Sequence, residues 1–127
     1  MRLKIVSIAI TLPILLGLGL FSMLYTRDIS DHYVAMAEEL RDAAEADDWE
    51  DAGQRMDALF ADWQSREGVL QIWVPHRDTD EVQKQMEGIQ AGLAIQDKSL
   101  LMEHAAGLIE ALDHLHHRDD LSISNIL

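Results

Sequence analysis

Twenty consecutive residues without a charge, Ile5 to Leu24, constrain this chain more than any other feature of its sequence. A helix of that length spans about 30 Å, the thickness of the hydrocarbon core of a bilayer. Arg2 and Lys4 precede the segment, and Asp28 is the first acid after it. Because positive flanks stay on the cytoplasmic side, we expect a cytoplasmic N-terminus and an extracytoplasmic remainder at the cell membrane.

A cleaved secretory signal is the competing interpretation of this segment. Signal peptides have a shorter apolar region, usually followed by a small-x-small cleavage site. Here the segment runs into Ser22-Met23-Leu24-Tyr25-Thr26, which contains no Ala-x-Ala pattern. We therefore predict an uncleaved, single-pass signal anchor. Residues 1–27 would form the cytoplasmic start and the transmembrane helix, and residues 28–127 would form the extracytoplasmic domain.

The two parts differ in charge. Residues 1–27 carry three bases and no acid, whereas residues 28–127 carry all 23 acids and seven bases, a net charge of −16. A domain this acidic does not neutralise phosphates, which argues against a nucleic-acid partner. The chain also has no cysteine. That absence excludes disulfides, thiol catalysis and cysteine-ligated zinc or iron–sulfur sites.

Apolar residues at steps of three and four predict amphipathic helices throughout the acidic part. A first helix is expected over residues 29–46, either separate from the apolar span or continuous with it. A second is expected to follow Asp48, and a fourth to follow Asp97, because both side chains suit a helix N-cap. The third should begin near Thr79 or Asp80.

Two boundaries are less constrained by the pattern. The second helix is expected to continue to Val74, where Pro75 ends it. The alternative is a stop at Gly68, followed by an extended segment over residues 69–74. After the fourth helix, we expect residues 119–127 to form a separate tail.

A weak internal repeat relates the two halves of the acidic part at an offset of 49 residues. It aligns Tyr33 with Val82, Asp48 with Asp97, and Trp63 with Leu112. The repeat predicts two similar helical hairpins, although any two amphipathic hairpins could align in this way. In both cases the expected fold is all-α. The N-terminal transmembrane helix would be followed by a four-helix up-down bundle or by two stacked tetratricopeptide-like helical hairpins.

The order of these features resembles a known family. The features are the basic start, the apolar span, Asp48-Trp49-Glu50, His114 near the end of the last helix, and the terminal Asn125-Ile126-Leu127. Together they resemble domain-of-unknown-function family 4363, small N-terminally anchored helical proteins of Gram-positive spore-forming bacteria. The resemblance covers nearly the whole chain. It implies topology and location only, because the family brings no known activity.

Histidines are expected to gather at the membrane-proximal end of the bundle. His114 and His117 share a helix face at i and i+3, and with His76 they are candidate ligands for a divalent metal such as zinc. The plainer interpretation is that histidines at a helix C-terminus favour the dipole and cap carbonyls. No fixed metal signature is present, so we expect no cofactor.

Four apolar residues are candidates for a contact with a partner or with the membrane. Trp49 lies in the first turn of the acidic part, and Leu70, Ile72 and Trp73 lie where the returning second helix should reach headgroup level. The alternative is that Ile72 and Trp73 pack under the C-terminal tail.

The sequence contains no glycine-rich phosphate loop and no nucleophile elbow, so we do not expect an enzyme. The expected function is that of a membrane-anchored extracytoplasmic interaction module that binds a protein or peptide. The alternative is a metal- or pH-responsive sensor that uses the membrane-proximal histidines. The sequence predicts no particular oligomeric state.

Overall fold

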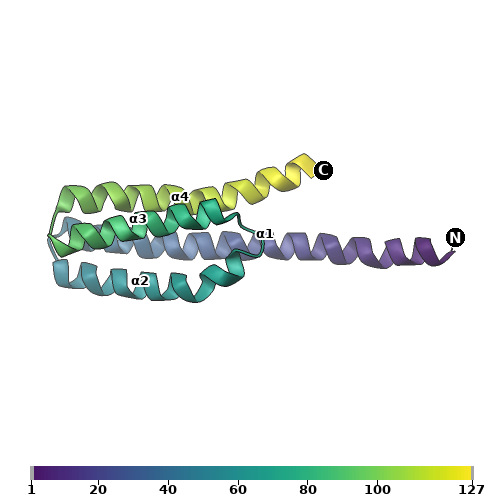
Figure 1. Ribbon diagram of the computed structural model, residues 1–127, viewed down its shortest axis with the longest axis horizontal. Coiled ribbons are helices and arrows are strands. Elements are labelled where there is room, and N and C mark those ends of the chain that lie inside the picture. The colour runs from purple at the N-terminus through teal and green to yellow at the C-terminus, as the bar shows by residue number, and fades with distance from the viewer. Residues whose placement is uncertain (1, 127) are drawn as a thin grey trace.

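The computed structural model describes the backbone of residues 2–126 and the side chains of residues 2–115. Within these residues the protein forms four helices and no strand (Figure 1). The helices are α1 (Arg2–Glu45), α2 (Trp49–Leu70), α3 (His76–Ala94) and α4 (Lys98–Ile126). The predicted all-α fold is therefore confirmed.

The helices form an up-down bundle. Each helix packs against the ones before and after it in the chain, and α4 closes the ring by packing against α1. All neighbours are consequently antiparallel, and α1 lies diagonally across from α3 (Figure 1). This closed ring is the first of the two expected architectures, since stacked hairpins would not bring α4 back onto α1.

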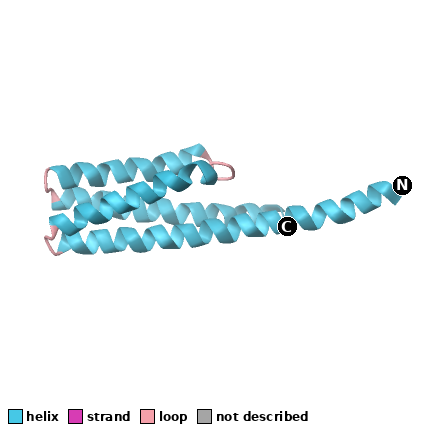
Figure 2. Cartoon of the chain, turned by 90° about the horizontal axis from the view of Figure 1, so that it is seen from below, coloured by secondary structure: helices cyan, strands magenta, loops and turns pink. Residues whose placement is uncertain are grey.

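Helix α1 is a single element that belongs to both parts of the protein. From Leu3 to Leu24 its leucine, isoleucine, valine and phenylalanine side chains are exposed, and from Thr26 to Ala44 one face of the same helix is buried in the bundle. Figure 2 shows the N-terminal end of α1 projecting beyond the other three helices. Of the described helices, only α1 is long and apolar enough to cross a membrane.

The core follows the predicted stripes. Its largest fully buried side chains include Trp63 and Tyr33, whose rings meet edge to face at 5.5 Å. Such an arrangement contributes about 0.5–1.5 kcal/mol beyond the burial of area alone. Trp63 Nε1 has no hydrogen-bond partner among the described residues. Ser30 is also buried and donates to the carbonyl oxygen of Leu112 at 2.6 Å, which links α1 to α4.

The two short turns at the far end of the bundle have the same geometry, 49 residues apart. Asp47 and Gln96 both adopt a positive φ, of 61° and 50°. Each next residue then caps a helix: the Asp48 carboxylate accepts from the N–H of Asp51, and the Asp97 carboxylate accepts from the N–H of Leu100. The internal repeat predicted from the sequence is therefore present in the turns as well as in the buried stripes.

Helices α3 and α4 approach each other closely at glycine. A Cβ added at Gly92 would lie 2.9 Å from the backbone nitrogen of Leu101, a fully buried residue of α4. At Gly53, in α2, an added Cβ would meet nothing within 4 Å. Gly92 therefore sets the spacing between two helices, whereas Gly53 does not.

Two predicted boundaries are wrong. Helix α2 ends at Leu70, and residues 71–74 form a hydrogen-bonded turn in which Leu70 O accepts from the N–H of Val74 at 2.8 Å. Pro75 disfavours helical geometry at Val74, the residue directly before it, so the helix does not continue into Pro75. Helix α3 then begins at His76, because the missing N–H of Pro75 is not needed just before a helix.

The C-terminal boundary also differs from the prediction. Helix α4 continues to Ile126, where a separate tail was expected from residue 119. The tail sequence contains neither glycine nor proline, so nothing in it breaks the helix. The side chains of residues 116–127 lie outside the described residues.

Candidate functional site

Aromatic, charged and hydrogen-bonding side chains lie together where the bundle meets the apolar half of α1. We call this region the span-proximal end and define it as residues 25–33 of α1, residues 62–70 of α2, and the turn 71–75. It contains an aromatic cluster, a pocket and a network of polar side chains.

The aromatic cluster joins the turn to α1. The rings of Phe21 and Tyr25 stack at 5.9 Å, and Tyr25 meets Trp73 edge to face at 5.5 Å. The indole N–H of Trp73 donates to the hydroxyl oxygen of Thr26 at 2.7 Å, and Thr26 is fully buried. These contacts fix the turn at the level of residues 25 and 26, immediately after the apolar span.

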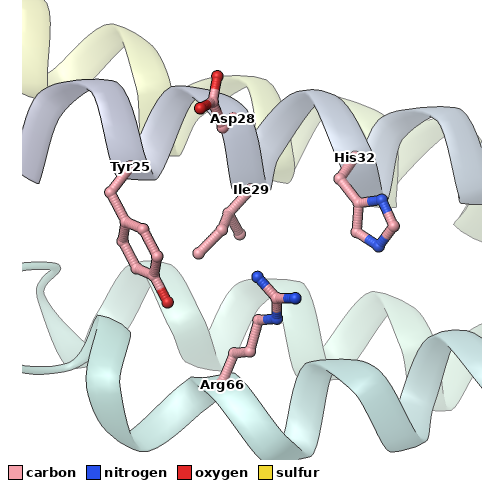
Figure 3. Close-up of a pocket in the computed structure, with 5 residues that line it drawn as sticks. All are labelled: Tyr25, Asp28, Ile29, His32 and Arg66. Atoms are coloured by element: carbon pink, nitrogen blue, oxygen red, sulfur yellow. The ribbon is translucent and has the colours of Figure 1, made fainter.

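The pocket lies between α1 and α2 and has a volume of about 280 Å³. It is lined by Tyr25, Asp28, Ile29, His32 and Arg66. Figure 3 shows the Arg66 guanidinium rising from α2 into the space between Tyr25 and His32, whereas Asp28 points away from α2. The pocket therefore presents a cation and a phenol toward solvent, with a carboxylate on the outer face of α1.

Asp62 is the centre of the polar network behind this pocket. Its carboxylate accepts from Tyr33 Oη at 3.2 Å, pairs with Arg66 Nε at 3.2 Å, and lies 3.0 Å from His32 Nε2. The hydrogen bond with His32 is the largest influence on the pKa of Asp62 and holds it below its ordinary value. Asp62 is therefore ionised at neutral pH, and it orients three side chains of the span-proximal end.

Tyr33 is the buried member of this network. Burial raises the pKa of its phenol above the ordinary value, and the negative charge of Asp62 adds to this effect. The Tyr33 hydroxyl also donates toward the backbone oxygen of Asp62 at 3.1 Å. The phenol therefore stays protonated and acts as a donor that joins α1 to α2.

A second hollow lies at the opposite end of the bundle, with a volume of about 370 Å³. Arg55 crosses it to reach Glu39 at 2.8 Å and Asp51 at 3.0 Å. Nearby, Lys98 pairs with Asp47 at 2.8 Å. These side chains are well exposed, and exposed ion pairs contribute little. This end matches the solvated acidic turn that the sequence predicts.

Two of the three candidate metal ligands, His76 and His114, have side chains that the structure describes. His76 begins α3, and His114 lies on α4 with its side chain 65% exposed and its Nε2 3.9 Å from Glu110. Among the side chains of residues 2–115, no group of three histidines and acids is placed to hold a metal. The side chain of His117 lies outside the described residues, so the full predicted set stays a prediction.

The four candidate contact residues have different surroundings. Trp49 and Trp73 are half-buried against the core, Trp73 on α1 rather than under any described part of the tail. Ile72 is 76% exposed. Leu70 is fully buried, so its assignment to a contact surface is wrong. Leu70 faces the core because it continues the stripe of Met56, Leu59 and Trp63.

Sequence reasoning did not identify Thr26, Asp62 or Arg66 as members of a site. Asp62 and Arg66 carry one detectable signal, because opposite charges at i and i+4 share a helix face. Thr26 carries none, since its partner Trp73 is 47 residues away. Only the packing of the turn against α1 brings these two residues together.

Comparison with protein families identifies the family of this chain. It belongs to the family described as a domain of unknown function, DUF4363, whose model matches residues 20–126. The match begins inside the apolar span and covers the whole bundle, which confirms the resemblance noted from the sequence. No curated protein and no solved structure matches the chain.

Proposed function

We propose that this DUF4363 protein is a membrane-anchored helical module that binds a protein partner through its span-proximal end. Its N-terminus would lie in the cytoplasm, and its acidic bundle outside it. The observation that carries the proposal is the continuity of α1, which passes from the apolar span into the bundle core without a linker. The pocket is thereby held at one height and one rotation relative to the span.

The exposure of the apolar side chains in the first half of α1 supports the membrane part of the proposal. The leucine, isoleucine, valine and phenylalanine side chains from Leu3 to Leu24 are 47–87% exposed, and a continuous apolar surface of that size needs lipid or another protein to cover it. The length of the span matches a bilayer. The bases before it and the acids after it favour a cytoplasmic N-terminus.

The binding part is supported by the chemistry of the pocket. Arg66 pairs with Asp62 through Nε, and its terminal guanidinium nitrogens extend into the space between Tyr25 and His32 (Figure 3). Such a donor set suits an acidic side chain of a partner. A partner held in the same membrane meets this pocket at high effective concentration, because both proteins are restricted to one surface.

Photo-crosslinking in native membranes tests the binding proposal. A photoreactive residue replaces Val69, which is exposed one helical turn after Arg66, or Ile95, which is exposed at the opposite end. We expect position 69 to crosslink to a discrete membrane protein, and Arg66→Ala to abolish that product. Equal products from both positions, or a product unaffected by Arg66→Ala, would overturn the assignment of the pocket.

Cysteine labelling tests the topology separately. The chain has no native cysteine, so a single cysteine reports one position. A membrane-impermeant maleimide should label Ile95→Cys in intact cells and leave Leu3→Cys unlabelled until the cells are opened. The reverse pattern would place the bundle in the cytoplasm.

A pH-responsive sensor is the second candidate, and the His32–Asp62 contact is the observation that favours it. Histidine changes charge between pH 5 and 8, and this contact joins α1 to α2 beside the pocket. Arg66 is the other charged group at Asp62. If the crosslink from position 69 changes between those pH values in the natural chain but not in His32→Gln, the sensor reading gains support. An identical response in both would remove it.

A further inference from the structure

We infer that the turn between α2 and α3 is a second membrane contact, in which Ile72 inserts among the lipids at the boundary between headgroups and acyl chains. The inference rests on the proposed anchoring of α1 and adds a lipid surface to the partners of the bundle. The turn would then contact the membrane surface beside the span.

The height of the turn follows from the contact between Trp73 and Thr26. Thr26 lies two residues after Leu24, the last residue of the uncharged span, which corresponds to about 3 Å along a helix. The indole N–H of Trp73 is hydrogen-bonded to its hydroxyl oxygen at 2.7 Å. The turn therefore lies where the hydrocarbon core ends if the span crosses a bilayer.

The side chains of the turn suit that boundary. Ile72 is 76% exposed and Val69 is 44% exposed, so both offer apolar surface to the surroundings. Trp73 and Tyr25 lie beside them with their rings in contact. Tryptophan and tyrosine are enriched at membrane interfaces, because each combines an apolar ring with a polar edge.

The charge of this stretch also differs from that of the rest of the domain. Residues 68–77 contain no acid and one arginine, Arg77, although residues 28–127 carry a net charge of −16. Anionic lipid headgroups attract nearby bases, whereas acids beside them are repelled. The turn is thus free of the acids that would hold it away from a membrane surface.

The small size of the exposed surface favours lipid over a protein. A stable protein interface needs about 800 Å² from each partner, and two exposed aliphatic side chains supply far less than that. Insertion of one or two side chains is sufficient for a lipid contact when α1 already holds the turn at the surface, because the second contact is then intramolecular.

Site-directed spin labelling of the full chain tests this contact. The protein is reconstituted into vesicles of phosphatidylethanolamine and phosphatidylglycerol, with one nitroxide at Ile72→Cys, Ile95→Cys or Leu15→Cys. Ile95 is the matched control, an isoleucine 68% exposed at the opposite end of the bundle. We expect the label at 72 to collide with oxygen more than with a water-soluble nickel chelate, as the label at 15 does. The label at 95 should show the opposite preference.

Each other outcome has a defined meaning. A label at 72 that behaves like the label at 95, while the label at 15 lies in the bilayer, overturns the inference and leaves the anchor intact. A label at 15 exposed to water overturns the anchor, and the inference with it. Spin–spin broadening confined to position 72 would show that a second copy of the chain covers the turn, which also overturns the lipid contact.

Tryptophan fluorescence provides a measurement without labels. Trp63 is buried and Trp49 lies at the opposite end of the bundle, so lipids with brominated acyl chains should quench mainly Trp73. We expect Ile72→Asp to lower the quenched fraction and Ile95→Asp to leave it unchanged. Equal quenching in both variants would contradict an insertion that depends on Ile72.

Discussion

Replacing Gly92 with alanine tests whether the spacing between α3 and α4 is set by one missing side chain. The new Cβ would lie 2.9 Å from the backbone nitrogen, 3.0 Å from Cα and 3.1 Å from Cβ of Leu101. Two of these three atoms belong to the backbone of a buried helix, so they are not displaced by a rotamer change. Overpacking of this kind costs up to about 3 kcal/mol.

Helix propensity opposes this loss. Alanine is favoured over glycine inside a helix by about 1 kcal/mol, which leaves a net destabilisation near 2 kcal/mol for Gly92→Ala. The matched control is Gly53→Ala in α2, where the added Cβ meets nothing within 4 Å. It should gain the propensity term alone and stabilise the bundle by about 1 kcal/mol.

The measurement is guanidinium unfolding of the full chain in detergent micelles, followed by helical circular dichroism. The two variants carry the same chemical change, so we expect their unfolding free energies to differ by about 3 kcal/mol with opposite signs relative to the natural chain. If Gly92→Ala is as stable as the natural chain, the close approach of α3 and α4 at this residue does not exist in solution. A lower unfolding free energy for Gly53→Ala than for the natural chain would show that the space beside Gly53 is not open.

Three further predictions concern the span-proximal end and the far turns. Thr26→Val leaves the indole N–H of Trp73 without its acceptor and should lower the unfolding free energy by about 1–3 kcal/mol, whereas Thr26→Ser keeps the hydroxyl and should lose less; denaturant midpoints of both variants check this. The pKa of Asp62 is lowered in the folded state, so its contribution to stability is present above the ordinary value of 3.8 and is lost as pH falls through the folded value. Acid unfolding of Asp62→Asn should therefore depend less steeply on pH in that range, and identical slopes would contradict the network. Gln96→Gly removes the strain of a side chain at a positive φ of 50°. It should stabilise the fold by about 1 kcal/mol and so raise the thermal midpoint, whereas a lowered midpoint would count against the left-handed geometry of residue 96.

Local chemistry was sufficient to predict most of the architecture. Helical spacing indicated the buried stripes, and Asp48 and Asp97 were recognised as N-caps because a short acid before an apolar stripe satisfies free N–H groups. The 49-residue repeat also led to the two matching turns. The stripes and the caps depend on residues only a few positions apart, so they can be predicted from the local sequence pattern.

The site depended on contacts that a periodic pattern does not contain. Helix lengths predict Trp73 near the membrane, but they do not predict its contacts with Thr26 and Tyr25, which form because the turn after Leu70 packs against α1. Pro75 is expected to end α2, whereas the helix ends at Leu70 and a hydrogen-bonded turn fills residues 71–74. Asp62 reaches His32 and Tyr33 only because α2 returns antiparallel to α1.

The unbroken helix α1 also couples the orientation of the bundle to that of the apolar span. A helix turns by 100° and rises by 1.5 Å for each residue, so the number of residues between the apolar span and Thr26 determines which way the pocket faces around the axis of the span. Any rotation of the apolar half must turn the whole bundle, since no flexible joint separates them. A torque applied to the span by a neighbouring helix would therefore be delivered at Glu45, about 31 Å beyond Leu24.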